Sequence, residues 1–149
     1  MIVVTELATA CGILAALAIC GKEVGQKGAI PGAIFTDPEI AMVGLTEADA
    51  KAKGIETLVG RFPFLASGRA QASRETDGFV KLVADKATGK LLGAGIVGPG
   101  ASDLISEAAL GLRLGATLDD LASTIHPHPT LPEAMMEAAE AATGQASTY

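Results

Sequence analysis

Residues 78–97, GFVKLVADKATGKLLGAGIV, contain two apolar runs of strand length with a short polar segment between them. The runs cover 78–84 and 91–97, and both are rich in the apolar residues that favour strands. Gly89 lies near the end of the polar segment, where a tight turn needs a residue without a side chain. The stretch therefore predicts an antiparallel hairpin, and with it an antiparallel sheet.

The flanking segments predict more strands before the hairpin and helices after it. Pro38 cannot donate to a strand ladder, so residues 30–44 predict two short strands and not one long strand. The other expected elements are, in chain order, a short helix from Thr46 to Gly54, a strand over 57–64, a polar loop over 65–76, a helix over 101–114, a short helix opened by Thr117 and a final helix over about 131–142. This order predicts the α+β class, an antiparallel sheet with helices packed on one side, preceded by an N-terminal helix.

The first 21 residues are apolar apart from Glu6 and two threonines. No Lys or Arg precedes this run, as it would in a signal peptide, and the run is barely long enough to span a membrane. A signal peptide and a membrane span stay as lesser alternatives to a helix without an amphipathic stripe, of the kind made to be buried on most of its sides. Glycines, lysines and a proline follow over 22–32 and predict a linker.

The composition limits the functions that the chain can serve. Its net charge is −6 and its Lys and Arg residues are scattered, which argues against nucleic-acid binding. The mean hydropathy of +0.40 predicts apolar surface that a partner or another segment covers. Cys11 and Cys20 fit neither a metal site nor a C-x-x-C redox pair, so both are expected to be small buried side chains.

Residues 93–98, GAGIVG, have the G-x-G-x-x-G spacing of a dinucleotide-binding turn. In such a site a helix begins within the glycine turn, so that its N-terminal N–H groups meet the pyrophosphate. Here Ile96 and Val97 prolong a strand, and the turn falls at residues 98–100. The motif therefore predicts a strand and not a nucleotide site.

The chain has two histidines, and both lie in residues 126–133, HPHPTLPE. Histidine is the side chain that exchanges protons most readily near neutral pH, and the three prolines of this stretch make its backbone stiff and extended. Glu133 begins a strong helix-forming run, so it is expected in a first helical turn that faces back toward the histidines. The stretch predicts a rigidly held titratable group with a carboxylate beside it.

Two other interpretations of the same residues stay open. Thr130 and Glu133 have the T-x-x-E spacing of a helix capping box, which would give Glu133 a purely structural role. His126, His128 and Glu133 could instead hold a metal ion, because alternate residues of an extended segment face the same way. The lack of a third strong nitrogen or sulfur ligand nearby argues against the metal site.

The stretch HPHPTLPE resembles the C-terminal motif of the pyridine nucleotide-disulfide oxidoreductases, and among them most nearly that of the dihydrolipoamide dehydrogenases. The run TDPEIAMVG, residues 36–44, is similar to the entry strand of the dimerisation domain of that family. The resemblance spans roughly residues 30–149 and extends more weakly into the first helix, where Leu17 replaces the usual glutamate. It implies that His128 is the acid/base partner of a reactive thiolate, that Glu133 orients it, and that His126 has no catalytic role.

The resemblance also implies a domain organisation and partners. Residues 1–29 would be the end of a flavin domain, and residues 30–149 a dimerisation domain that forms a homodimer and offers His128 to the other subunit. FAD and NAD are implied for the longer enzyme, with neither bound by this chain, which lacks the C-x-x-x-x-C pair of the family and is expected to be inactive alone. A lipoyl-bearing protein would be the substrate, in the cytoplasm, with no membrane partner.

Two further functions stay open. A self-association module would use the same fold and apolar surface without any catalytic use of His128. The domain could also come from another reductase of the family that acts on a different disulfide or on mercuric ion, because the residues that select the substrate would lie outside this chain.

Overall fold

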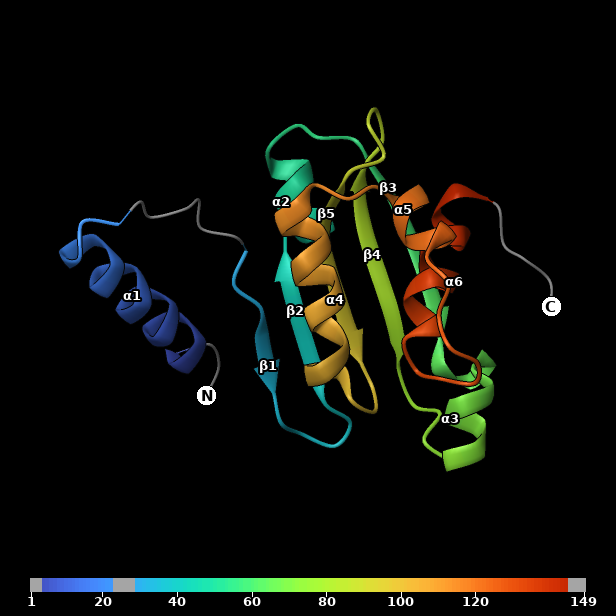
Figure 1. Ribbon diagram of the computed structural model, residues 1–149. Coiled ribbons are helices and arrows are strands. Elements are labelled where there is room, and N and C mark those ends of the chain that lie inside the picture. The colour runs from blue at the N-terminus through green and yellow to red at the C-terminus, as the bar shows by residue number, and fades with distance from the viewer. Residues whose placement is uncertain (1–3, 23–28, 145–149) are drawn as a thin grey trace.

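The computed structural model describes residues 4–22 and 29–144 of the chain (Figure 1). The helices are α1 Val4–Ile19, α2 Glu47–Ala52, α3 Gly68–Ser73, α4 Ala101–Leu114, α5 Leu118–Ser123 and α6 Glu133–Thr143, and a 3-10 turn, η1, covers Phe64–Ala66. The strands are β1 Gly32–Ile34, β2 Ile40–Gly44, β3 Thr57–Pro63, β4 Phe79–Asp85 and β5 Leu91–Val97.

The strands form one antiparallel sheet of five in the order β1-β2-β5-β4-β3. β4 and β5 pair as the sequence predicts, with Phe79 opposite Val97, and the turn residue Gly89 has a φ of +70°. The two short strands on either side of Pro38 are β1 and β2, and β2 adds to the free side of β5. The hairpin is therefore confirmed and supplies two of the three inner strands.

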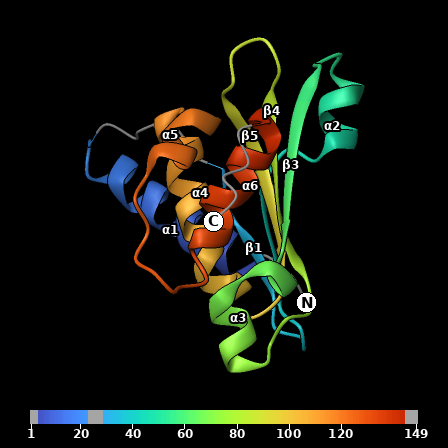
Figure 2. The same ribbon diagram turned by 90° about the vertical axis from the view of Figure 1, so that its right-hand side faces the viewer.

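α4 and α6 lie across one face of the sheet, and α5 packs against α6 (Figures 1 and 2). α4 contacts β2 and β5, whereas α6 contacts β3 and β4. The largest fully buried side chains come from both layers and are Phe64, Val80, Leu82, Ile96, Leu118 and Met135. An α+β fold with an antiparallel sheet and helices on one side is thus confirmed.

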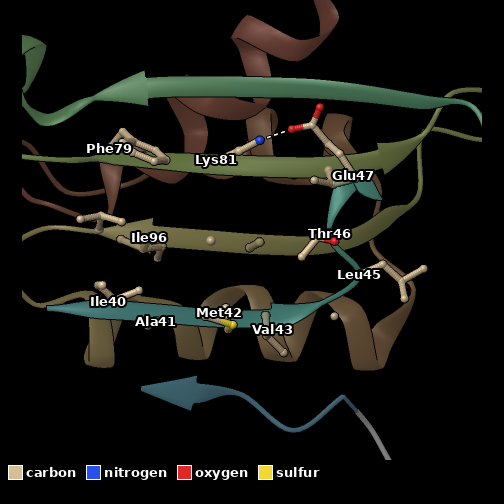
Figure 3. A pocket seen from close by; sticks show the side chains of 15 residues that line it. Ile40, Ala41, Met42, Val43, Leu45, Thr46, Glu47, Phe79, Lys81 and Ile96 are labelled. Atoms are coloured by element: carbon tan, nitrogen blue, oxygen red, sulfur yellow. Dashed lines mark ion pairs between the residues drawn. The ribbon is translucent and has the colours of Figure 1, made fainter. Parts of the chain in front are cut away.

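The opposite face of the sheet is open over β2 and β4 in the described part of the chain. Figure 3 shows Ile40 and Met42 of β2 and Phe79 and Lys81 of β4 on this face, around a shallow apolar hollow. Lys81 forms an ion pair with Glu47 at the start of α2. Apolar side chains therefore remain accessible on this face, and Met42 is 45% exposed.

The short helices α2 and α5 begin at the residues that the sequence indicates. The Thr46 hydroxyl accepts a bond from the N–H of Asp49, and the Asp49 carboxylate accepts one from the N–H of Thr46 at 3.0 Å. Thr117 and Asp120 make the same pair of bonds at the start of α5. Each capping box satisfies N–H groups that have no partner within the helix.

The prediction of a polar loop over 65–76 was wrong, because this segment contains η1 and α3. The Ser67 hydroxyl accepts from the N–H of Ala70, so Ser67 caps α3, and Ala70 is fully buried. The helix ends at Arg74, which has a left-handed backbone with a φ of +62°. A helix of six residues has too few apolar positions to show a period, so its capping serine was the one available signal.

α1 confirms the expected N-terminal helix, but the prediction that Cys11 and Cys20 are buried was wrong. Ile13 is 57% and Ile19 is 85% exposed, and Cys11 and Cys20 are exposed free cysteines and not buried ones. The reason is that little of the described chain packs against α1. Among the described residues, no helix is both long enough and apolar enough to cross a membrane.

Candidate active site

The loop between α5 and α6, residues 124–132, holds His128 at the edge of an open pocket. The pocket is lined by Phe62, Ala66, Ser67, Gly68, His128, Glu133, Met136 and Glu137. One wall therefore comes from the end of β3, η1 and the start of α3, and the other comes from α6. The His128 side chain is 79% exposed, so its ring is accessible to a molecule that enters the pocket.

His128 and Glu133 are paired, as the sequence predicts for the two candidate site residues. The distance from His128 Nδ1 to Glu133 Oε1 is 2.8 Å, and Glu133 Oε2 accepts a bond from the N–H of Thr130 at 2.6 Å. The capping box forms only in part, because the Thr130 hydroxyl donates to the carbonyl of Pro127 and not to the helix. Glu133 thus both contacts the His128 ring and closes the loop, so the capping contact does not exclude the contact with the histidine.

The pKa of the Glu133 carboxyl lies below its usual value. Partial burial raises it, but hydrogen bonds from the Thr130 N–H and the His128 ring lower it, together with the attraction of His128 and His126. An ionised carboxylate only accepts hydrogen bonds, so the proton of the His128–Glu133 bond belongs to Nδ1. Nε2 then keeps its lone pair and is the atom that can take a proton from a substrate.

Glu137 is a second carboxyl group in the pocket, and the sequence analysis missed it. Burial raises the pKa of Glu137, and the neighbouring carboxylates of Glu140 and Glu133 raise it further. Its position four residues after Glu133 places both on one face of α6, and this spacing was the signal that could have found it. The pocket therefore disfavours additional negative charge beside the His128–Glu133 pair.

Replacing Glu137 by glutamine is expected to raise the melting temperature of the chain at pH 7 by about 1–3 °C. A raised pKa means that the folded chain binds the proton of Glu137 more strongly than the unfolded chain, so ionised Glu137 destabilises the fold at neutral pH. As the pH falls through the raised pKa and below the ordinary value of 4.5, the wild-type side chain becomes neutral and the difference closes. Calorimetry as a function of pH measures the difference in melting temperature between the variant and the wild type, and Glu75→Gln, at an exposed position, is the control. A difference that grows as the pH falls would contradict the prediction.

His126 does not join His128 and Glu133, so the structure does not assemble the candidate metal site. Its ring lies between Thr124 and α4, with Nδ1 2.9 Å from the Thr124 carbonyl and Nε2 3.0 Å from Glu107 Oε1. Among the described residues, no cluster of three or more potential ligands is placed to hold a metal ion. Sequence analysis missed Glu107, and no local pattern connects it to a histidine 19 residues away.

The glycine motif at 93–98 runs along β5 and ends at the turn that precedes α4, as the sequence predicts. Gly93 and Gly95 belong to β5 and pair with neighbouring strands. A Cβ added at Gly93 would collide with the backbone of Leu45, and one at Gly98 would come within 2.5 Å of the Phe64 ring. Gly93 and Gly98 therefore serve close packing within the domain, whereas a Cβ at Gly95 would meet nothing within 4 Å.

Comparison with known proteins gives the family. Residues 30–139 match the model of the pyridine nucleotide-disulphide oxidoreductase dimerisation domain. The chain belongs to this family. Among its relatives, the dihydrolipoyl dehydrogenase of Haloferax volcanii is 57% identical over 136 residues, and that of Bacillus subtilis is 50% identical over 135 residues.

The relatives are much longer than this chain. The two matches cover 91% and 89% of the chain but only 29% and 28% of the Haloferax and Bacillus proteins. A crystal structure of LpdA from Mycobacterium tuberculosis superposes with a TM-score of 0.77 at 31% identity, over 85% of this chain and 28% of that one. The flavoprotein disulfide reductase RclA from Escherichia coli, at 23% identity, shares the fold with a TM-score of 0.80. The chain is thus the dimerisation domain of a dihydrolipoyl dehydrogenase-like disulfide oxidoreductase.

Proposed function

We propose that this domain supplies the acid/base pair His128 and Glu133, in trans, to the active site of a longer flavin-dependent dihydrolipoyl dehydrogenase. One observation carries the proposal: Glu133 holds His128 Nδ1 at 2.8 Å, while the exposed His128 ring lines an open pocket. A self-association module would not need a histidine that is both 79% exposed and oriented by a carboxylate. Other reductases of the family are alternatives that the substrate tests below separate.

The proposed step is a proton transfer at His128 Nε2. A dihydrolipoyl thiol gives its proton to Nε2, and the thiolate attacks a disulfide of the partner subunit, because only the thiolate is an efficient nucleophile. A mixed disulfide forms as the original S–S bond breaks, and one sulfur of that bond leaves as a thiolate. The bond from Nδ1 to Glu133 stabilises the resulting imidazolium and keeps the ring in one orientation. The same ring returns its proton when the reaction runs in the opposite direction.

The cofactors of the proposed enzyme, FAD and NAD, would be held outside this chain. FAD and NAD would supply the redox chemistry of the full enzyme, and His128 would exchange a proton with the substrate thiol. This assignment fits the glycine motif of 93–98, in which Gly93 and Gly95 pair within the sheet and do not open a helix. It also fits a division in which residues 1–29, with α1, are the end of a flavin domain and residues 30–149 are the dimerisation domain.

The proposed partner is a second copy of the chain, and the proposed substrate is a lipoyl-bearing protein in the cytoplasm. A histidine that acts in trans needs an interface close to the loop 124–132. Ile125 in this loop is 95% exposed, and Leu110 and Leu114 on α4 are 57% and 73% exposed. Because Glu107 of α4 contacts the loop through His126, these apolar side chains lie on the elements that a partner must cover.

The double variant Leu110→Glu/Leu114→Glu is expected to weaken dimerisation of the chain at least about tenfold. Two carboxylates would have to leave water at a surface that presents leucines in the wild type. Light scattering after size exclusion, over a range of micromolar concentrations, measures the change. Met42→Glu on the open sheet face is the matched control. If Met42→Glu disrupts the dimer and Leu110→Glu/Leu114→Glu does not, the assignment of the interface to α4 is contradicted.

The proposed function is tested by joining this chain to the preceding part of the Haloferax volcanii relative, in place of the segment to which it is 57% identical. The chimera is expected to reduce NAD with dihydrolipoamide, and glutathione and mercuric ion serve as competing substrates for the alternative reductases. To test action in trans, subunits with His128→Gln are mixed with subunits that lack the redox thiol. Each kind of subunit should be inactive by itself, and the mixed dimers should regain activity. If both kinds fold and their mixed dimers are still inactive, the proposal is contradicted.

A further inference from the structure

The loop that carries His128 is held by side chains and not by its backbone. In the described structure, no backbone–backbone hydrogen bond involves residues 125–129. Pro127 and Pro129 have no N–H group to donate, so the stiffness of the loop does not fix where it lies on the domain. Its position must therefore come from the contacts of its side chains with the helices on either side.

Two such contacts hold the loop on opposite sides of His128. On the C-terminal side, Glu133 of α6 binds both the His128 ring and the Thr130 N–H. On the N-terminal side, His126 Nε2 lies 3.0 Å from Glu107 Oε1 of α4. The Glu133 contact alone would let the loop turn about α6, whereas two contacts to two helices fix it.

The His126 ring is the more buried of the two histidine rings. Its side chain is 6% exposed, against 79% for His128, and the Glu107 side chain is 31% exposed. Both of its nitrogens have polar partners, the Thr124 carbonyl at 2.9 Å and the Glu107 carboxylate at 3.0 Å. A buried ring with both nitrogens engaged has one orientation, which makes His126 a suitable fixed point for the loop.

We propose that His126 and Glu107 are positioning residues that anchor the loop to α4 and so set the orientation of the His128 ring toward Glu133. The inference rests on the proposed function for its effect on catalysis. His126 does not contact the substrate and acts through the backbone between positions 126 and 128. The consequence is that a change on α4, a helix that does not line the pocket, alters the proton-transfer group.

The test on the chain itself is the tautomer of His128 at pH 8, measured by long-range ¹H–¹⁵N correlation of the imidazole rings. The wild type is expected to hold its neutral His128 mainly with the proton on Nδ1, because that proton bonds to Glu133. In Glu107→Met the loop loses its anchor, and His128 is expected to populate both tautomers. Asp103→Asn is the matched control, because it also removes one carboxylate from α4 but lies at an exposed position, and it should leave His128 unchanged.

A second variant keeps the test decisive if Glu107→Met does not fold. His126→Phe/Glu107→Met replaces the pair by apolar side chains of similar size, a kind of replacement that proteins often tolerate. A folded variant with an unchanged His128 tautomer would overturn the proposal. Failure of both variants to fold would also overturn it, in favour of a purely structural pair.

Kinetics of the chimera add a second readout. The anchor variants are expected to lower kcat about 10–100-fold with KM within about twofold, because a displaced proton acceptor affects the reacting geometry more than substrate binding. A failure of the proposed function has a different signature. In that case His128→Gln leaves the chimera active, while the tautomer change in the anchor variants can still appear.

Discussion

The chimera with His128→Gln is expected to oxidise dihydrolipoamide about 10²–10⁴-fold more slowly than the chimera with the wild-type domain. Glutamine has about the size of histidine and can accept a hydrogen bond, but it cannot take a proton at neutral pH. The thiol must then lose its proton to water, and only its small thiolate fraction can attack the disulfide. The measurement is kcat for the reduction of NAD by dihydrolipoamide, since the loss should appear in kcat more than in KM.

Two controls separate the loss of a proton acceptor from a general disturbance of the pocket. Glu133→Gln keeps a hydrogen bond to His128 Nδ1 but removes the charge that stabilises the imidazolium, so a smaller loss of about 10–100-fold is expected. For His128→Gln, raising the pH should recover activity, because more thiolate then forms without the base. If His128→Gln keeps full activity in a folded dimer, His128 has no part in catalysis and the self-association module becomes the better account.

Local features of the sequence predicted most of the fold. The hairpin over 78–97, the break at Pro38 and the capping boxes that begin at Thr46 and Thr117 are all decided by residues within a few positions of one another. α3 was missed because, unlike the equally short α2 and α5, it has a capping Ser67 but no acidic residue in its first turn to complete a capping box. The strand order, in which β2 joins β5 across the two intervening strands β3 and β4, depends on packing that no local pattern contains.

The candidate site divides in the same way. His128 and Glu133 are five residues apart, so the stretch itself predicted their pairing and the structure places them 2.8 Å apart. The wall from η1 and α3 and the Glu107 partner of His126 come from segments that are distant in the sequence. The sequence could therefore predict which residue can exchange a proton, but not which residues hold that residue in place.

The packing of α6 against β3 supports the pocket and depends on a single glycine. Gly60 of β3 is buried beneath α6, and a Cβ added there would collide with the backbone carbonyl of Ala138 and lie 2.8 Å from the Cβ of Ala142. A side chain can change rotamer to relieve a clash, but a carbonyl in the middle of a helix can move only with the helix. Because α6 carries Glu133 and Met136, a shift of this helix also opens the wall of the pocket.

Gly60→Ala is therefore expected to lower the free energy of unfolding of the chain by about 3 kcal/mol, at the upper end of what overpacking usually costs. The melting temperature should fall by roughly 10 °C, which circular dichroism in heat and urea measures. Gly68→Ala is the matched control, because nothing lies within 4 Å of a Cβ at the first residue of α3, and its effect should stay below about 1 kcal/mol. Equal stabilities for the two variants would show that α6 can move away from β3 at little cost, and that the position of Glu133 is fixed by the loop contacts alone.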